Sequence, residues 1–316
     1  GIEFKDTLIN KTYKVNSKVV INATGVFADK IIKLDQPNSK KMIKPSQGVH
    51  IVLEKKFLDS PHAIMIPHTT DGRVLFAVPW KNHVVVGTTD TQIEDTLDEP
   101  KALKEEINFI LNNASKYMSI KPSKKDIKSV FTGLRPLAST SNQKSTKEVS
   151  RSHKINISTT GLISILGGKW TTYRKIAEDA VDASISLGGL RKRNCKTKNL
   201  RIHGFRRKVD WDDPQHVYGS DSRKLKSYGS SIDNKSLSKK FFISNNIIYW
   251  SVTKEMAMTV EDVLARRTRC LFLDSTESLR IAPLVAKKMA EIMEKDKAWV
   301  DEELKKFNKL SKNYKV

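Results

Sequence analysis

The chain twice shows the same succession of a short apolar run, a tight turn and an amphipathic stripe. The first instance runs from Lys18–Ile21 through Asn22–Gly25 to a stripe over Phe27–Leu34. The second has β-type runs at 155–157 and 162–166, then Gly167–Lys169, and then apolar positions spaced three and four apart: Tyr173, Ile176, Ala177, Ala180 and Val181. Strands alternate with period two and helices with period 3.6, so we predict strand, turn and helix at both places.

Between these two units the pattern changes to short apolar runs, which we expect to form an antiparallel sheet: Val49–Leu53, Ala63–Ile66, Val74–Val78 and Val84–Gly87. The pairs Asp71-Gly72 and Lys81-Asn82 separate the later runs, as hairpin turns do. Pro100–Tyr117 then has its apolar residues on one stripe and predicts a helix.

The region after the polar and basic stretch Gly188–Lys198 predicts a second, all-helical domain. Asp274-Ser275 can cap a helix with one apolar face, and Trp299–Leu310 supplies a further amphipathic helix. The polar segment Trp211–Asn245 is weakly patterned, and we expect loops and short helices there.

Composition is that of a globular protein: 316 residues, 38% hydrophobic and 29% charged. No apolar run approaches the roughly 18 residues that span a bilayer, so a transmembrane enzyme is not expected. Cys195 and Cys270 stand alone, which gives no support to a disulfide framework or a zinc site and fits a reducing compartment. The net charge of +22 implies attraction to something anionic, or else lysines spread over solvated faces.

The strongest candidate for chemistry is the segment 166–174, Leu-Gly-Gly-Lys-Trp-Thr-Thr-Tyr-Arg. Two glycines after a strand let the backbone approach a flat ligand, and the helix that follows presents free N–H groups and a partial positive charge. Such a site suits an anion or a delocalised negative ring. The alternative is an ordinary strand-to-helix turn with a hydroxyl N-cap.

Arg135 is the second candidate, in the segment Phe131–Pro136. We expect a turn at Gly133 and the following proline to restrict its backbone, and the guanidinium suits bidentate binding of phosphate or carboxylate. A surface salt bridge is the alternative. Arg151 and His153, which open the next run, either add cationic contacts or lie on the exposed face of a strand.

The third candidate is His50, at the end of Pro45–His50, which we expect to be a loop that enters a strand. An imidazole there can take a proton from a hydroxyl as hydride leaves its carbon, although six other histidines compete for the role. HExxH, GxSxG and an outstanding carboxylate pair are all absent, so metal hydrolase, serine hydrolase and glycosidase readings lack support. The 14 glycines form neither GxGxxG nor a Walker-type loop, so these residues cannot hold a dinucleotide in the usual manner alone.

Seven segments, taken in order, resemble the FAD-dependent glycerol-3-phosphate dehydrogenase family of the D-amino-acid-oxidase-like flavoproteins. They are the motifs VINATG at 20–25, KPSQGVH at 44–50, VPW at 78–80, VGTTD at 86–90, TGLRP at 132–136, GGKWTTYR at 167–174 and TVEDVLARRTR at 259–269. The last motif belongs to the helical C-terminal domain that distinguishes these dehydrogenases from most relatives.

The resemblance implies an α/β and α+β fold: a partial Rossmann-like FAD-binding domain with an inserted antiparallel-sheet substrate domain, followed by an all-helical C-terminal domain. The implied boundaries are 1–45 and 151–187 for the flavin domain, 46–150 for the substrate domain and 188–316 for the helical domain. We expect a fragment, because the phosphate-binding βαβ unit of the family has no counterpart here and the chain opens at Gly1 without a secretory or transit pattern.

The resemblance also implies roles for individual residues. Residues of the two turns would bind FAD: Ala23, Thr24, Gly25, Gly167, Gly168, Lys169, Thr171 and Thr172. The second turn and its helix would stabilise negative charge at N1 and O2 of the reduced flavin. The catalytic candidates are His50, Arg135 and Lys169, with His50 near the C2 hydroxyl, and the substrate-binding candidates are Arg135, Arg151 and Lys169. Trp170 replaces the smaller residue expected after Lys169.

The implied reaction oxidises sn-glycerol 3-phosphate to dihydroxyacetone phosphate, with hydride passing to FAD and electrons to a membrane quinone. The resemblance implies a cytoplasmic protein attached peripherally to the inner (cytoplasmic) membrane through an anionic surface, and it leaves room for a homodimer. A fragment of this kind is expected to bind FAD poorly and to be inactive by itself.

Three alternatives remain at this point. One is another flavoenzyme of the same group, acting on an amino acid or hydroxy acid, and another is a glycerol-3-phosphate oxidase that uses oxygen. The third is a basic nucleic-acid-binding protein, which would interleave clustered Lys and Arg with exposed aromatic residues or carry a known motif; the sequence has neither, so no nucleic-acid partner is expected.

Overall fold

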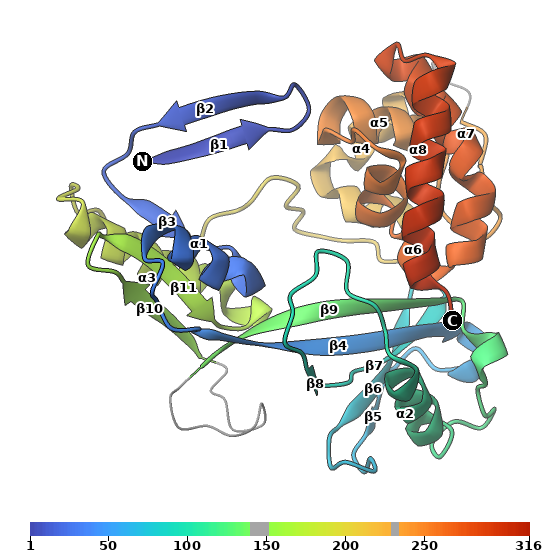
Figure 1. Ribbon diagram of the computed structural model, residues 1–316. Helices are drawn as coiled ribbons and strands as arrows, with labels where there is room; N and C mark the ends of the chain where they lie inside the picture. Colours follow the sequence, from blue (N-terminus) through green and yellow to red (C-terminus); the bar gives the residue numbers. More distant parts are fainter. Residues whose placement is uncertain (140–151, 229–233) are drawn as a thin grey trace. The chain divides into compact units, whose positions relative to one another are not determined.

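The computed structural model describes residues 1–139, 152–228 and 234–316 (Figure 1). The chain divides into two compact units. Unit 1 comprises Gly1–Gly48, Asp90–Pro100 and Gly133–Leu200, and unit 2 comprises Val49–Thr89, Lys101–Thr132 and Arg201–Val316. Since the antiparallel sheet and the helical region group into one unit, the four-part domain division stays a prediction.

Unit 1 contains a small sheet in the order β10-β11-β3. Strand β10 (His153–Ile157) pairs antiparallel with β11 (Leu162–Gly167), and β11 pairs parallel with β3 (Val20–Asn22). Helix α1 (Ala28–Asp35) follows β3, and α3 (Tyr173–Leu187) follows β11. Both predicted strand–turn–helix units are therefore confirmed.

A small core in unit 1 forms where α1 meets the strands: Ala28, Ile32, Ile43, Ala138 and Leu166. The apolar spacing of α1 places Ala28 and Ile32 on one face, four residues apart, which is why this face is buried. A separate hairpin of β1 (Ile2–Asp6) and β2 (Lys11–Val15) precedes β3. The short β8 (Thr91–Gln92) pairs with the start of β4 at Ser46 and Gln47.

The sheet of unit 2 confirms the predicted antiparallel arrangement. Strands β5 (Ile64–Ile66), β6 (Leu75–Trp80), β7 (His83–Gly87) and β4 (Ile43–Glu54) are neighbours in that order. Strand β9 (Ser129–Ala138) also pairs with β4. The unit boundary falls within β4 and β9, because Gly48 and Gly133–Ala138 belong to unit 1.

Alternate residues of β4 belong to two cores of unit 2. Val49, Ile51 and Leu53 lie in a core with α2 (Lys104–Ala114), whereas Val52 lies in a core with the C-terminal helices. Since successive strand residues point to opposite faces, the continuous apolar run of β4 is explained by burial on both sides.

The C-terminal region is helical, as predicted. It contains α4 (Ser222–Tyr228), α5 (Asn245–Glu255), a π-helical turn (Asp262–Arg267), α6 (Cys270–Leu273), α7 (Ser275–Met293) and α8 (Lys297–Ser311). Asp274 caps α7 as expected, since its carboxylate accepts the Glu277 N–H at 2.9 Å. Helices α7 and α8 lie side by side (Figure 1). Within the three described ranges, no helix has the length and apolar character that a membrane span requires.

Candidate functional site

The glycine pair at the end of β11 forms the predicted turn. Gly167 and Gly168 have φ values of 71° and 94°, a region that side chains rarely adopt. A Cβ on Gly168 would also lie 2.6 Å from Cδ1 of Ile176. The turn is followed by a 3-10 segment, Trp170–Thr172, and then by α3. These two positions therefore require glycine for both backbone conformation and packing.

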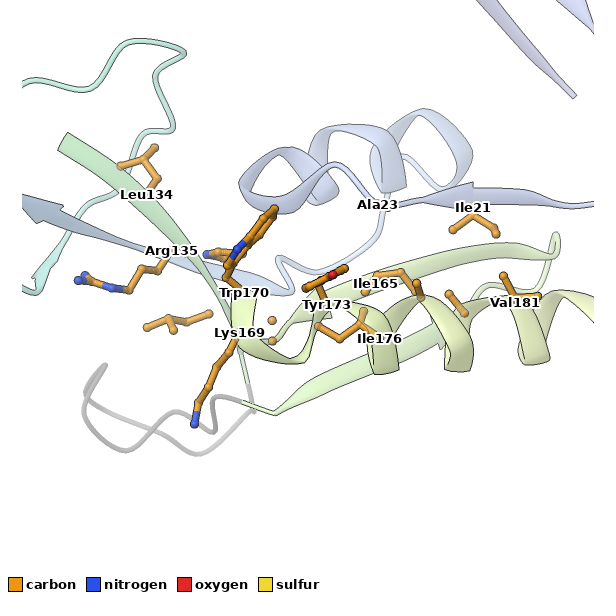
Figure 2. Close-up of a pocket in the computed structure, with 16 residues that line it drawn as sticks. Ile21, Ala23, Leu134, Arg135, Ile165, Lys169, Trp170, Tyr173, Ile176 and Val181 are labelled. Carbon is orange, nitrogen blue, oxygen red and sulfur yellow. The ribbon is translucent and has the colours of Figure 1, made fainter. Parts of the chain in front are cut away.

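A cavity of about 870 Å³ opens beside this turn, within unit 1 (Figure 2). Its apolar walls come from β3, β11 and α3, and include Ile21, Ile165, Ile176, Ala177, Ala180 and Val181. The predicted apolar stripe of α3 thus faces the cavity, and Tyr173 and Val181 remain 58% and 52% exposed. Ligand pockets typically have volumes of about 300–1,000 Å³ with apolar walls and few polar groups, so this cavity can hold a flat organic ring.

The start of α3 offers positive charge to that cavity. No side chain caps it: the Thr172 hydroxyl donates to the Lys169 carbonyl at 3.0 Å instead of accepting a helix N–H. The hydroxyl N-cap of the alternative interpretation is therefore absent at Thr172. The N–H groups of Thr172 and Tyr173 donate to the Lys169 and Trp170 carbonyls, so the helix dipole is what favours an anion at this end of α3.

Lys169 and Arg135 both line the cavity. Lys169 is exposed and forms no ion pair with any carboxylate in the described ranges. In Figure 2 the two side chains extend in different directions, one from the glycine turn and one from β9. They therefore supply cationic groups at two separate points of the lining.

Arg135 is held by polar contacts within unit 1. Its Nη1 lies 3.7 Å from the Asp90 carboxylate, which in turn accepts a hydrogen bond from the Ser46 hydroxyl. A Cβ on Gly48 would overlap the guanidinium, so this glycine makes the space in which Arg135 lies. Gly133 lies inside β9 and shows no left-handed backbone, so the predicted turn before Arg135 is wrong; a strand positions this residue.

The turn after β3 is organised by Asn22, a residue that the sequence analysis did not select. Its buried amide donates to the Ala28 carbonyl at 3.0 Å and to the Ser164 hydroxyl at 3.2 Å, and it accepts from the Thr24 hydroxyl at 2.7 Å. These bonds join the turn to α1 and β11. A buried side chain with several polar partners fixes the local geometry strongly. In the sequence, the position of Asn22 between two apolar residues was the signal that could have identified it.

The predicted cofactor residues divide into two groups. Ala23, Gly167, Gly168 and Lys169 line the cavity, whereas Thr24, Gly25, Thr171 and Thr172 are not part of the lining and shape the two turns beside it. Gly25 has φ of 60° and opens the 3-10 turn before α1. Trp170 and Tyr173, neither of them predicted as site residues, stack at 5.5 Å between ring centroids and belong to the lining.

His50 belongs to unit 2, where it lies in β4; the predicted loop before it is wrong, because β4 already begins at Ile43. Its ring stacks on Phe131, with centroids 5.1 Å apart and an interplanar angle of 13°. It lines an apolar hollow of about 410 Å³ together with Phe76, Val78 and Trp80. It faces Gly87 in the register of β4 and β7, and a Cβ on that glycine would overlap the imidazole.

Of the remaining candidates, Arg151 lies outside the described residues. His153 is on β10, and its Nε2 lies 3.0 Å from the Asp179 carboxylate of α3. The Lys175 ammonium lies 2.8 Å from the same carboxylate and is the main reason that the pKa of Asp179 lies below its ordinary value. His153 lowers that pKa further. His153 therefore ties a strand to a helix and is not part of the cavity lining.

Comparison with known proteins identifies two family models along the chain. The model described as "FAD dependent oxidoreductase" matches residues 3–174, and the model described as "C-terminal domain of alpha-glycerophosphate oxidase" matches residues 158–300. The chain is 34% identical to a probable mitochondrial glycerol-3-phosphate dehydrogenase of Dictyostelium discoideum, over 99% of this chain and 52% of that protein. It is 35% identical to a mitochondrial glycerol-3-phosphate dehydrogenase of Arabidopsis thaliana, over 100% of this chain and 55% of that protein.

A solved structure shows the same architecture. The glycerol-3-phosphate dehydrogenase of Bacillus halodurans, in complex with FAD, matches 99% of this chain and 65% of its own with a TM-score of 0.82 and 26% identity. The chain thus spans about half the length of the curated relatives it matches. The expected fold class, a flavin-binding domain followed by a helical C-terminal domain, is confirmed. Since the first family model covers more than half of its residues, the chain belongs to the family of FAD-dependent oxidoreductases.

Proposed function

We propose that this chain takes part in the oxidation of sn-glycerol 3-phosphate to dihydroxyacetone phosphate. FAD would accept the hydride, and a membrane quinone would be the final electron acceptor. The cavity at the glycine turn carries this proposal, because it combines apolar walls, bare glycine backbone and an uncapped helix start. The near full-length similarity to proteins named glycerol-3-phosphate dehydrogenase supports the substrate.

The residues of the cavity fit a flavin. Apolar side chains of β11 and α3 can contact the faces of a ring, and Gly167 and Gly168 let the backbone approach its edge. Trp170 and Tyr173 form an exposed aromatic pair at the same lining, which can exclude water from a bound ring. When bound, FAD supplies the site that accepts hydride. The start of α3 and the Lys169 ammonium would stabilise negative charge at the ring edge next to them.

Arg135 is the proposed substrate-binding group. Its guanidinium would bind the phosphate of the substrate, since a planar fork of donors matches phosphate oxygens. Asp90 and the space above Gly48 hold the guanidinium in place before substrate arrives. Lys169 and Arg151 are further proposed phosphate contacts.

His50 is the proposed proton acceptor. As the C2–H bond breaks and hydride leaves, the proton of the C2 hydroxyl would pass to the imidazole, and the C2–O bond becomes the carbonyl of the product. Stacking on Phe131 fixes the plane of the imidazole ring.

The proposed location is a membrane surface. The net charge of +22 favours an anionic surface, and the relatives' names describe those proteins as mitochondrial, which favours a mitochondrial membrane over the cytoplasmic one expected earlier. A homodimer stays a prediction.

The test is the flavin absorbance of the protein expressed from its natural gene, recorded before and after anaerobic addition of sn-glycerol 3-phosphate. We expect bleaching of the flavin band that lactate and D-alanine do not produce. A bound flavin that does not respond to sn-glycerol 3-phosphate would overturn the substrate. If oxygen reoxidised the reduced flavin as fast as a quinone does, the chain would instead be assigned to an oxidase. The second family model, which is named after an oxidase, is the reason to test this outcome.

A further inference from the structure

Unit 2 contains a second cavity, of about 520 Å³, away from the sheet hollow that His50 lines. Its lining comes from the turn between β6 and β7, the segment 211–218, the segment 240–242 and the residues around α6. None of the proposed cofactor or substrate residues belongs to it. The cavity falls within the usual size range for small-molecule sites, about 300–1,000 Å³.

Lys81 lines this cavity from the hairpin turn. Both Lys81 and Asn82 have left-handed backbone, with φ of 47° and 62°, where asparagine and glycine are favoured and lysine is unusual. Its ammonium makes no ion pair with a carboxylate in residues 1–139, 152–228 and 234–316. Desolvation by neighbouring protein lowers the pKa of Lys81 from its ordinary value, and Cys270 opposes that shift. A cation in this position is available to an anionic ligand.

Tyr218 lies in the same lining, and its phenol hydroxyl has no hydrogen-bond partner in the part of the chain that the structure describes. Burial raises the pKa of this phenol, with smaller contributions from Glu255 and Cys270. Lys81 and Tyr218 both line this one cavity. An acceptor oxygen of a ligand in the cavity would receive a hydrogen bond from this hydroxyl.

The rim of the cavity is aromatic. Trp211 is 75% exposed and Phe242 is 44% exposed, and both belong to the lining. Trp211 makes a T-shaped contact with His216, with ring centroids 5.4 Å apart. A planar ligand can stack on exposed aromatic rings that lie beside a cationic group.

Two other cations of the lining are already paired. Lys240 lies 2.8 Å from Asp274, and Arg267 lies 3.7 Å from Glu255. Lys81 is thus the lysine of the lining that has no carboxylate partner in the described residues, and Asp212 adds one carboxylate to the same lining.

We propose that this cavity binds a nucleoside monophosphate, with the phosphate between Lys81 and Tyr218 and the base stacked on Trp211. The site is independent of the oxidation chemistry proposed for the rest of the chain. Its place on the helical region makes it a candidate for ligand control of the enzyme.

Isothermal titration calorimetry of the protein expressed from its natural gene tests this site, with AMP, inorganic phosphate and adenosine as probes. We expect saturable binding of AMP at one site, at least about tenfold tighter than either of the other two, because only AMP meets both halves of the site. Absence of saturable heat from AMP up to about 5 mM, an affinity too weak for a built site, would overturn the proposal.

Variants assign the two halves. Lys81→Met and Tyr218→Phe should weaken AMP and phosphate about tenfold, whereas Trp211→Ala should weaken AMP and adenosine but leave phosphate unchanged. Lys239→Met is the control, since Lys239 is exposed and lies outside the lining. Equal loss in Lys239→Met would show general charge attraction and overturn the site. Tyr218→Phe removes one oxygen and keeps the ring, so it remains informative if Lys81→Met unfolds.

A phosphate monoester can also come from a lipid headgroup. Vesicles that contain phosphatidic acid separate the two sources. Vesicle binding that Lys81→Met and Trp211→Ala abolish, without any binding of AMP, would assign the cavity to a lipid and overturn the nucleotide.

Discussion

Arg135 in unit 1 and His50 in unit 2 each lie over a glycine of a strand, but different kinds of partner hold their side chains. Each lies on a strand, and each lies over a glycine whose Cβ would overlap it: Gly48 for Arg135 and Gly87 for His50. Arg135 is then held by a carboxylate, Asp90, at 3.7 Å, whereas His50 is held by the ring of Phe131 at 5.1 Å between centroids. A carboxylate attracts the Arg135 guanidinium, whereas a stacked phenyl ring fixes the plane of the His50 imidazole.

The largest effect is expected at Arg135. Arg135→Met removes the proposed phosphate contact and leaves Asp90 without its cation, so kcat/KM for sn-glycerol 3-phosphate should fall about 10³-fold, mostly through KM. Steady-state kinetics with a soluble electron acceptor measures this. Arg193→Met, at an exposed arginine outside the cavity lining, should change kcat/KM little. An unchanged KM in Arg135→Met would remove this residue from substrate binding.

His50→Gln should act on kcat. Loss of a general base typically costs about 10²-fold or more, and KM should stay within about threefold because no binding charge is removed. His62→Gln, at an exposed histidine, is the control. A rise in KM with an unchanged kcat would instead assign His50 to substrate binding.

The two glycines test the comparison itself. Neither Gly48 nor Gly87 has a positive φ, so alanine fits the backbone at both and only the overlying side chain must move. A displacement of this size should cost about tenfold. Gly48→Ala should raise KM, as a mild form of Arg135→Met, and Gly87→Ala should lower kcat, as a mild form of His50→Gln. The same kinetic signature from both glycines would show that they serve the sheet rather than the side chains above them.

The smallest effect on chemistry is expected in the helical region, at Glu277. Arg280 is the main reason that the pKa of this carboxyl lies at about 2, below its usual 4.5. A carboxyl with a lowered folded-state pKa stabilises the fold above its unfolded pKa, and that contribution is lost as pH falls from about 4.5 to about 2. Glu277→Gln should therefore lower the free energy of unfolding by about 1–2 kcal/mol at pH 7, because half-exposed Arg280 weakens the pairing through solvent.

Chemical denaturation at several pH values measures that difference, which should shrink toward zero near pH 2. Flavin content and kcat should stay unchanged at pH 7. Glu291→Gln, whose carboxylate pairs with Lys288 and is 51% exposed, should change stability by less than about 0.5 kcal/mol. A loss of flavin in Glu277→Gln would couple the helical region to the cofactor site.

The sequence predicted the strand–turn–helix units well because their signals are local. The apolar run of β11, the positive-φ glycines and the stripe of α3 each follow from spacing within a few residues. The alternation of β6 and β7 around Lys81-Asn82 was readable for the same reason. Such elements need no knowledge of distant partners.

The wrong predictions concern strands whose partners are far away. Gly133 suggested a turn before Arg135, yet Gly133 lies inside β9, which pairs with β4. Pro45 and Gly48 suggested a loop, yet both lie inside β4. Gly48 is needed there by the Arg135 side chain, a contact across 87 positions of sequence that no local pattern contains. Asn22 and Asp90 were missed likewise, since their partners are at Ser164, Ser46 and Arg135.

The central claim is that the cavity at Gly167–Lys169 holds the flavin, and Gly168→Ala tests it most directly. A methyl group there would meet Ile176 of the cavity wall at 2.6 Å, whereas Gly72→Ala, at a similar φ of 78°, would meet nothing within 4 Å. The measurement is flavin bound per chain in the protein expressed from its natural gene, together with the thermal midpoint of each variant. We predict that Gly168→Ala loses flavin several-fold while Gly72→Ala keeps it, at similar thermal midpoints. Equal flavin content in both variants would contradict the assignment of the cavity.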